Sequence, residues 1–298
     1  MNGIFKIFHD NIYMNKDVRE KIQLRREEIT KIIDNEYYEF ELNSAISFFS
    51  GSYGRNTEIK SSDIDLIVIL PNSVKKRFDK RIGNIQSQFL TEVKEKIVKK
   101  FPRSEISSDG QVIVIDFSDS IKFEVVPCFK DEFGDFLYYA NTNDGGKWET
   151  MVPKKEIDAF NKGHENSNFI IKKFCRMIRS WKESNNVPIK GELIDAMVFD
   201  FFENYKGLKS EPFNCFDEYT KDFFEYIYKN IDYKSWFVPG SYRILKVENK
   251  EFLKRKIYQA FIYAEKAISL PVILTKSYYY SREYFWREIY GERFWKVK

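Results

Sequence analysis

Histidine and cysteine, which supply many metal centres and nucleophilic sites, are scarce in this sequence: 298 residues include two histidines and three cysteines. Cys128, Cys175 and Cys215 lie far apart without the spacing of a zinc site, so we expect buried thiols, no disulfides and a reducing compartment. His9 and His164 have no partner motif, and we expect surface or capping residues rather than ligands or bases. Metal binding through sulfur or imidazole is therefore not expected.

Glycine and proline are also few, with 13 and 8 copies, which argues against a turn-rich all-β protein. A strong excess of either charge is missing too, since 49 basic and 45 acidic residues are interleaved and leave a net charge of +4. Without a polybasic tail, we expect no membrane partner and no stable nucleic-acid partner, although a local site for anions stays open. No apolar run approaches the length of a membrane span, and the N-terminus lacks the features of a signal peptide, so we expect a cytoplasmic protein.

What the sequence does contain divides into two halves near residue 150. The first half reads as a helix over 17–40, a strand after residue 63, a helix over 74–101, and then the β-branched runs QVIVIDF and IKFEVVPCF. The short polar link between the two runs predicts a hairpin. Residues 1–150 are therefore expected to form a mixed sheet flanked by helices.

The second half, 151–298, has few strand signals. The segment NSNFIIKKFCRMIRSWKES places Ile170, Phe174, Met177, Ile178 and Trp181 on one helical stripe. Further helices are expected over 191–206, 216–230, 250–268 and 281–290. The prediction is an α+β protein in which a sheet domain packs against a mostly helical domain, with the active site in the cleft between them.

The most informative stretch is FFSGSYGRNTEIKSSDIDLIVILP. Because side chains alternate along a strand, Asp63 and Asp65 point to the same side. The residues after Asp65 are apolar on both faces, which is typical of a central strand, and two like charges at its start repel each other unless a cation lies between them. Hard oxygen ligands suit Mg²⁺, with substrate phosphates completing its coordination shell.

Two further features strengthen this interpretation. Gly51 permits a close backbone approach, and Ser52 with a following helix N-terminus offers donors to a triphosphate. Glu124, on a strand that is expected to lie beside that of Asp63, supplies a third carboxylate for a two-metal site. Each feature is weak alone, because a chain with 45 acidic residues contains Asp-X-Asp by chance. Their order, each at the edge of an apolar strand, favours a metal site over polar loops.

These residues resemble the nucleotidyltransferases with a DNA-polymerase-β-like core, and more narrowly the bacterial CD-NTases, the cGAS/DncV-like enzymes with a SMODS-type domain. The resemblance rests on segments that occur in the family's order: GSYGRNT, SDIDLIVIL, FEVVPCF, GGKWETMVP, CRMIRSWK and YFWREIYGERFW. It implies a polymerase-β-like catalytic core over 1–150, including the long N-terminal helix, and an OAS/cGAS-like helical lobe over 151–298.

The resemblance also implies residue roles. Asp63, Asp65 and Glu124 are the expected catalytic residues and ligands of two Mg²⁺ ions, for which Mn²⁺ can substitute. Glu124 is a mild departure, because many relatives have Asp there. Gly51 and Ser52 are expected to bind the donor triphosphate.

On the helix around Trp181, the resemblance implies phosphate contacts by Arg179 and Lys182. Many relatives have lysine where this chain has Arg179, which keeps the charge but changes its geometry. For any single basic residue of this helix, an exposed charge without a ligand is an equally good interpretation.

The implied function is synthesis of a cyclic di- or trinucleotide second messenger from nucleoside triphosphates, in anti-phage signalling of the CBASS type. The product would act through a separate effector protein. Two alternatives stay open: synthesis of a linear oligonucleotide or nucleotidyl transfer to an RNA or protein acceptor, and an inactive protein that only binds nucleotide. The intact Asp63 and Asp65 argue against the inactive protein.

Overall fold

The computed structural model describes residues 2–39, 43–208, 212–270 and 281–294. Its contacts divide the chain into two compact units, one of Met1–Met14, Arg55–Lys60 and Lys155–Lys298 and the other of Asn15–Gly54 and Ser61–Lys154. One boundary between the units lies near residue 155. The division differs from the expected domains in that the first 14 residues and the segment 55–60 group with the C-terminal part.

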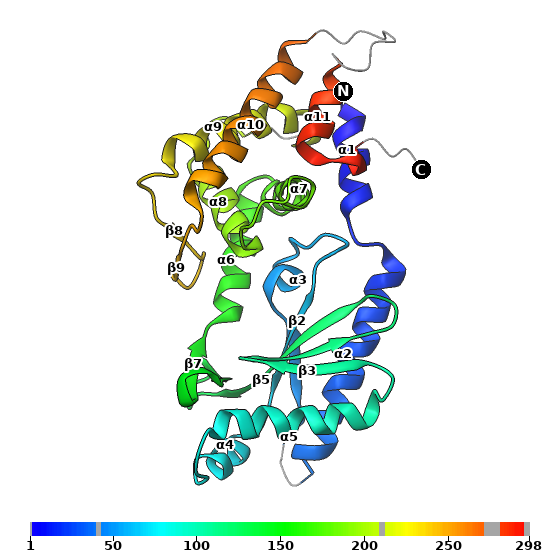
Figure 1. The fold of residues 1–298 in the computed structure, drawn as a ribbon, viewed down its shortest axis with the longest axis vertical. Coiled ribbons are helices and arrows are strands. Elements are labelled where there is room, and N and C mark those ends of the chain that lie inside the picture. Colours follow the sequence, from blue (N-terminus) through cyan, green and yellow to red (C-terminus); the bar gives the residue numbers. More distant parts are fainter. Residues whose placement is uncertain (1, 40–42, 209–211, 271–280, 295–298) are drawn as a thin grey trace. The chain divides into compact units, whose positions relative to one another are not determined.

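The sheet unit contains one mixed sheet in the order β1-β2-β5-β4-β3, with β6 pairing with β5 and β7 pairing with β6 (Figure 1). Its strands are β1 (Ile46–Phe49), β2 (Ile64–Ile69), β3 (Glu105–Asp109), β4 (Val112–Asp116), β5 (Lys122–Lys130), β6 (Leu137–Asn141) and β7 (Lys147–Met151). Strands β2 and β5 are parallel, and the other neighbours are antiparallel. The central position of β2 and the hairpin of β4 and β5 are both confirmed.

Helices α2 (Lys16–Tyr37), α4 (Asn72–Phe78) and α5 (Ile85–Lys100) belong to this unit. Phe89 of α5 contacts Phe129 of β5 with ring centroids 5.0 Å apart, and the Arg25 guanidinium of α2 lies over the Phe117 ring. Phe117 in turn contacts Phe123 of β5. Since Phe123 and Phe129 share one face of their strand, α2 and α5 cover that face, and Glu124 points to the opposite one.

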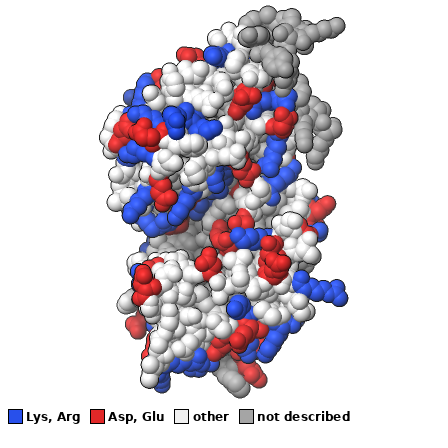
Figure 2. All heavy atoms as spheres, in the orientation of Figure 1, with Lys and Arg blue, Asp and Glu red and all other residues white. Residues whose placement is uncertain are grey.

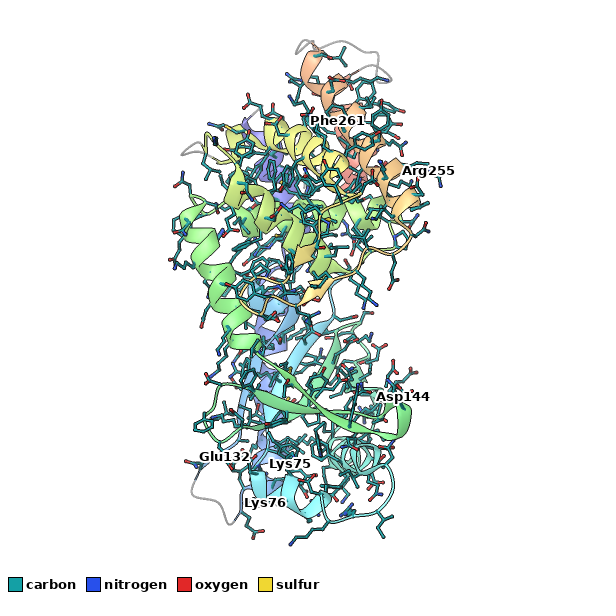
Figure 3. The ribbon with its side chains drawn as sticks, turned by 90° about the vertical axis from the view of Figure 1, so that its left-hand side faces the viewer. Lys75, Lys76, Glu132, Asp144, Arg255 and Phe261 are labelled. Carbon is teal, nitrogen blue, oxygen red and sulfur yellow. The ribbon has the colours of Figure 1, made fainter. Side chains whose placement is uncertain are left out.

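The helical unit contains α1 (Asn2–Ile12), α6 (Pro153–Asn166), α7 (Ile171–Ser184), α8 (Gly191–Asn204), α9 (Phe216–Asn230), α10 (Lys250–Ser269) and α11 (Arg282–Tyr290), with a small ribbon of β8 (Trp236–Phe237) and β9 (Ile244–Leu245). The five residues of the predicted α7 stripe are all buried in one core cluster. On α10, Arg255 is exposed whereas Phe261 packs against this core (Figure 3).

Several elements depart from the sequence-based expectation. The helix expected over 74–101 is two helices, because Gly83 has a φ of +87° and Asn84 caps α5 by accepting a hydrogen bond from the Ser87 amide. Helices α1 and α6 and strands β1, β3, β6 and β7 were not expected. Among the described residues, no helix is both long enough and apolar enough to cross a membrane.

One of the two histidines has a role that the sequence predicted. His164 caps α7, since its Nδ1 accepts a hydrogen bond of 3.3 Å from the Lys172 amide. The surface position expected for His9 is wrong: its side chain is buried beside the Arg176 guanidinium, 3.2 Å away. Burial and the charge of Arg176 lower the pKa of His9 to about 4, so its imidazole is neutral near pH 7.

Phe5 fixes helix α1 to the core of the helical unit. Its ring contacts Trp286 and Phe294 edge-on, with centroids 5.2 and 5.3 Å apart, and it is 1% exposed. We predict that Phe5→Ala lowers the free energy of unfolding by about 3–5 kcal/mol, because it leaves a cavity among aromatic rings. Urea unfolding measures this, with Ile7→Ala, an exposed residue of the same helix, as the control. Equal losses for the two variants would contradict the packing role.

Candidate functional site

Three carboxylates lie at one end of strands β2 and β5, on the face opposite the one that α2 and α5 cover. Asp65 of β2 is the direct register partner of Glu124 on β5, and neighbouring partners in a sheet share a face. Asp63, two residues before Asp65, points to the same side. The side chain of Asp63 is 49% exposed and that of Glu124 is 29% exposed. The alignment expected for the third carboxylate is therefore present in the sheet.

Lys122 completes this face. It lies two residues before Glu124 on β5, and continuing the register by one residue places it beside Asp63. Its Nζ donates to Asp63 Oδ2 at 3.3 Å and to Glu124 Oε1 at 3.2 Å. Burial alone would lower the pKa of Lys122, but the bonds to Glu124 and Asp63 outweigh it and raise the pKa. The ammonium is therefore charged and lies between two of the three carboxylates.

The Gly-Ser turn, which follows β1, lies against Asp65 of β2 at the same site. The Ser50 amide donates to the Asp65 carbonyl at 2.9 Å, and Gly51, with a φ of +53°, begins the short helix α3 (Gly51–Arg55). A Cβ atom on Gly51 would lie 1.7 Å from Oδ2 of Asp65, so only glycine fits there. Ser52 follows as a largely buried residue.

As the side chains stand, the described residues contain no group of three or more His, Cys, Asp or Glu close enough to hold a metal ion. The carboxylates nevertheless fit a divalent cation of the Mg²⁺ type. All three are hard oxygen donors on one face, and two of them already share a cation, the Lys122 ammonium. Soft metals have no matching ligands here, because Cys128 is a buried thiol further along β5.

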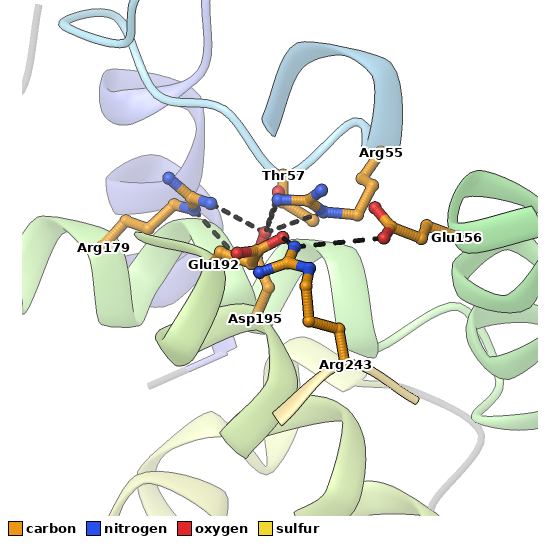
Figure 4. Close-up of polar contacts among 7 residues, drawn as sticks. All are labelled: Arg55, Thr57, Glu156, Arg179, Glu192, Asp195 and Arg243. Carbon is orange, nitrogen blue, oxygen red and sulfur yellow. Dashed lines mark hydrogen bonds and ion pairs between the residues drawn. The ribbon is translucent and has the colours of Figure 1, made fainter. Parts of the chain in front are cut away.

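Arg179 and Lys182, the residues expected to contact phosphate, lie on α7 in the helical unit, and Lys182 is half-buried. The Arg179 guanidinium forms a bidentate pair with Asp195 of α8, with Nε 2.9 Å from Oδ1 and Nη2 2.7 Å from Oδ2 (Figure 4). The contact of Arg179 with phosphate stays a prediction, and it would compete with this pair.

Asp195 is the centre of a buried polar cluster. Besides Arg179, its Oδ2 accepts from Arg55 at 3.1 and 3.2 Å and from the Thr57 hydroxyl at 2.7 Å. Burial would raise the pKa of Asp195, but the two guanidiniums hold it below its usual value. Beside this cluster, Arg243 pairs with Glu192 of α8 at 2.5 Å (Figure 4). The cluster fixes segment 55–60 to the helices of its unit.

Sequence reasoning missed Lys122, Arg55 and Asp195. A signal for Lys122 was present, because K-X-E on a strand places both side chains on one face. Arg55 follows the Gly-Ser turn within GSYGR, yet its partner Asp195 lies 140 residues further along the chain, and no local pattern connects them.

Comparisons with known proteins identify the family. Residues 1–163 match the family described as Second Messenger Oligonucleotide or Dinucleotide Synthetase domain, abbreviated SMODS. The chain belongs to the SMODS family. The resemblance to bacterial CD-NTases is thereby confirmed.

Solved structures share the fold of this SMODS chain. DncV of Vibrio cholerae, a cyclic AMP-GMP synthase in complex with a linear intermediate, has a TM-score of 0.74 at 12% identity, covering 95% of this chain and 93% of DncV. CdnC of E. coli MS115-1 with ATP has a TM-score of 0.72 at 15% identity, covering 98% of each chain. The expected α+β fold with a polymerase-β-like core is confirmed.

Curated relatives match over shorter segments. Cyclic GMP-AMP synthase CdnE03 of Staphylococcus schleiferi is 28% identical over 174 residues, which is 50% of each chain. A CCA-adding enzyme of Thermoplasma volcanium is 33% identical over 165 residues, 54% of this chain and 34% of that enzyme. The match thus spans half or less of these curated relatives.

The contact of Gly51 with Asp65 predicts a position-specific effect of an added methyl group. We expect Gly51→Ala to lower the free energy of unfolding by at least about 2 kcal/mol more than Gly134→Ala, because the new Cβ overlaps the Asp65 carboxylate. Gly134 is a matched control, since its φ is also positive, at +76°, but its Cβ would meet no atom within 4 Å. Urea unfolding of both variants measures the difference. Equal losses would mean that only backbone strain matters at Gly51.

The Asp195 cluster predicts a pH-dependent contribution to stability. Asp195→Asn should lower the free energy of unfolding at pH 7 by about 3–5 kcal/mol, because two buried guanidiniums lose their anion. Since the folded pKa lies below the usual 3.8, the contribution is fully present above about pH 4 and is lost as the pH falls through the folded pKa. The difference between wild type and variant should therefore shrink in acid.

Urea unfolding at pH 7, 5 and 3 measures this difference. The control is Asp232→Asn, which breaks the exposed pair with Lys254 and is expected to cost less than about 1 kcal/mol. A difference between wild type and Asp195→Asn that does not change with pH would show that the charge of Asp195 is not what stabilises the cluster.

Proposed function

We propose that this protein joins nucleoside triphosphates into a cyclic di- or trinucleotide second messenger and releases pyrophosphate. The observation that carries the proposal is the alignment of Asp65 with Glu124 across the parallel pair β2 and β5, with Asp63 on the same face. Gly51 lies against Asp65 at this site, so a phosphate-binding turn and a carboxylate site meet there.

In this reaction a 2′- or 3′-hydroxyl of an acceptor nucleotide attacks the α-phosphate of a donor triphosphate. Gly51 and Ser52 hold the donor phosphates, and Asp63, Asp65 and Glu124 hold the divalent ions. Two Mg²⁺ ions, when bound, supply activation of the hydroxyl and neutralisation of the leaving group. Asp65 or Glu124 accepts the proton of the hydroxyl. The residues thus contribute positioning and charge, which is what phosphoryl transfer requires.

The comparisons support a cyclic product. The family's description names oligonucleotide or dinucleotide synthesis, and the curated relative from S. schleiferi is named a cyclic GMP-AMP synthase. From this kinship we further propose a cytoplasmic role in anti-phage signalling of the CBASS type, in which the product activates a separate effector protein.

A second candidate is nucleotidyl transfer to an acceptor chain, favoured by the 33% identity with a CCA-adding enzyme. An enzyme that acts on RNA needs basic residues along the nucleic-acid backbone. On the face drawn in Figure 2, basic and acidic side chains are interspersed rather than separated into a basic surface. We therefore rank this candidate second.

We predict that Asp63→Asn with Asp65→Asn reduces product formation at least about 1000-fold, because the metal-binding carboxylates supply most of the charge stabilisation. Purified protein is incubated with all four ribonucleoside triphosphates and Mg²⁺ or Mn²⁺, treated with phosphatase and analysed by mass spectrometry. The control, Glu132→Gln with Asp144→Asn, makes the same charge change at two exposed positions (Figure 3).

A phosphatase-resistant product at the mass of a cyclic di- or trinucleotide, present in wild type and control but absent from the variant, supports the proposal. Undiminished pyrophosphate release by the folded Asp63 and Asp65 double variant would refute the site. Incorporation of label only when RNA is added would instead favour the second candidate.

A further inference from the structure

Lys122 occupies a place on the carboxylate face that the sheet register determines. It precedes Glu124 by two residues, so both side chains leave β5 on the same side. Its partner on the antiparallel strand β4 is Asp116, while Val114 is the partner of Glu124. The ammonium therefore bonds Asp63, just before β2, and the register partner of Lys122 on the other side, Asp116 of β4, is also acidic.

The two bonds of Lys122 give it the role that a metal ion would otherwise fill on this face. They join Asp63 to Glu124, which are two of the three proposed metal ligands. Without a cation, these like charges would repel one another. A divalent ion that binds the same carboxylate oxygens has to replace the ammonium.

The exposure of the contacts makes such an exchange feasible. The side chains of Lys122 and Asp63 are 36% and 49% exposed, and ion pairs in such surroundings contribute little to stability. A lysine is also held by a flexible four-carbon stem, so the ammonium can leave without moving the strand. The pair thus satisfies the carboxylates and yet can be broken.

We propose that Lys122 is the resident counter-ion of the carboxylate site, which a divalent metal ion must displace in order to bind. This inference rests on the proposed function, since it takes Asp63, Asp65 and Glu124 as the metal ligands. Lys122 acts as a positioning residue in the metal-free state and weakens the affinity of the nucleotide-free protein for the ion.

The test is direct titration of the nucleotide-free, full-length protein with Mn²⁺, in which electron paramagnetic resonance counts the free ion. Lys122→Met should lower the Kd for Mn²⁺ at least about fivefold, the effect of removing one charge a few ångströms away in high-dielectric surroundings. Lys122→Arg keeps the charge and should stay within about twofold of wild type. Should Lys122→Met fail to fold, Lys122→Gln removes the same charge.

Lys130→Met is the matched control, because it removes the same charge from the other end of β5. At about 3.3 Å per residue it lies about 20 Å from Glu124, where salt screens its charge. Its Kd for Mn²⁺ should equal that of wild type. In addition, the Mn²⁺-induced rise in Tm, measured against EDTA, should be larger for Lys122→Met than for wild type.

Unchanged or weaker Mn²⁺ binding by Lys122→Met overturns the inference. An equal gain in Mn²⁺ affinity in Lys130→Met overturns it too, as does the absence of Mn²⁺ binding in both wild type and Lys122→Met. Asp63→Asn with Asp65→Asn separates this failure from that of the proposed function. If the double variant binds Mn²⁺ as wild type does, the carboxylates are not the metal site. If it loses binding while Lys122→Met changes nothing, the site stands and only the role of Lys122 fails.

Discussion

The parallel pairing of β2 with β5 is the constraint on which the carboxylate site depends. Its register places Asp65 directly beside Glu124, and a shift of one residue would turn Glu124 to the helix-covered face. The apolar residues of β2 and β5 on that face, including Phe123 and Phe129, are fully buried and fix the register. The hydrophobic core of the sheet unit thus positions the charged residues on its other face.

This arrangement places like charges close together, and two features of the structure lie against them. The single charge of Lys122 offsets part of the charge of Asp63 and Glu124 from within the same sheet. At Asp65, the Gly51 backbone approaches so closely that no side chain fits between them. A close backbone approach of this kind is what lets a turn bring its amides to bound phosphates. The glycine and the carboxylate are therefore one structural feature, although 14 positions separate them in the sequence.

Local patterns in the sequence predicted the placement of the carboxylates on their strands but not all of the fold. Alternation placed Asp63 and Asp65 on one side, and β-branched runs predicted β4 and β5, because strand periodicity is a short-range signal. Strands β3, β6 and β7 are short and partly exposed, so their hydrophobic alternation is weak. Helix α1 was missed because its partners, Trp286 and Phe294, lie at the other end of the chain. The Arg55 and Asp195 pair is long-range in the same sense.

Burial distinguishes the two kinds of ion pair in this protein. The side chains of Arg55 and Asp195 are 5% and 1% exposed. Breaking such a pair leaves an unpaired charge in the core, at a cost of about 3–5 kcal/mol. Lys122 and Asp63 also form an ion pair, but this pair is exposed to water, where its loss costs little. The Asp195 cluster is therefore suited to holding segment 55–60 in one place, whereas the Lys122 contacts are suited to exchange. By the same argument, the phosphate contact of Arg179 stays a prediction, and it would require Arg55 and Thr57 alone to keep Asp195 hydrogen-bonded.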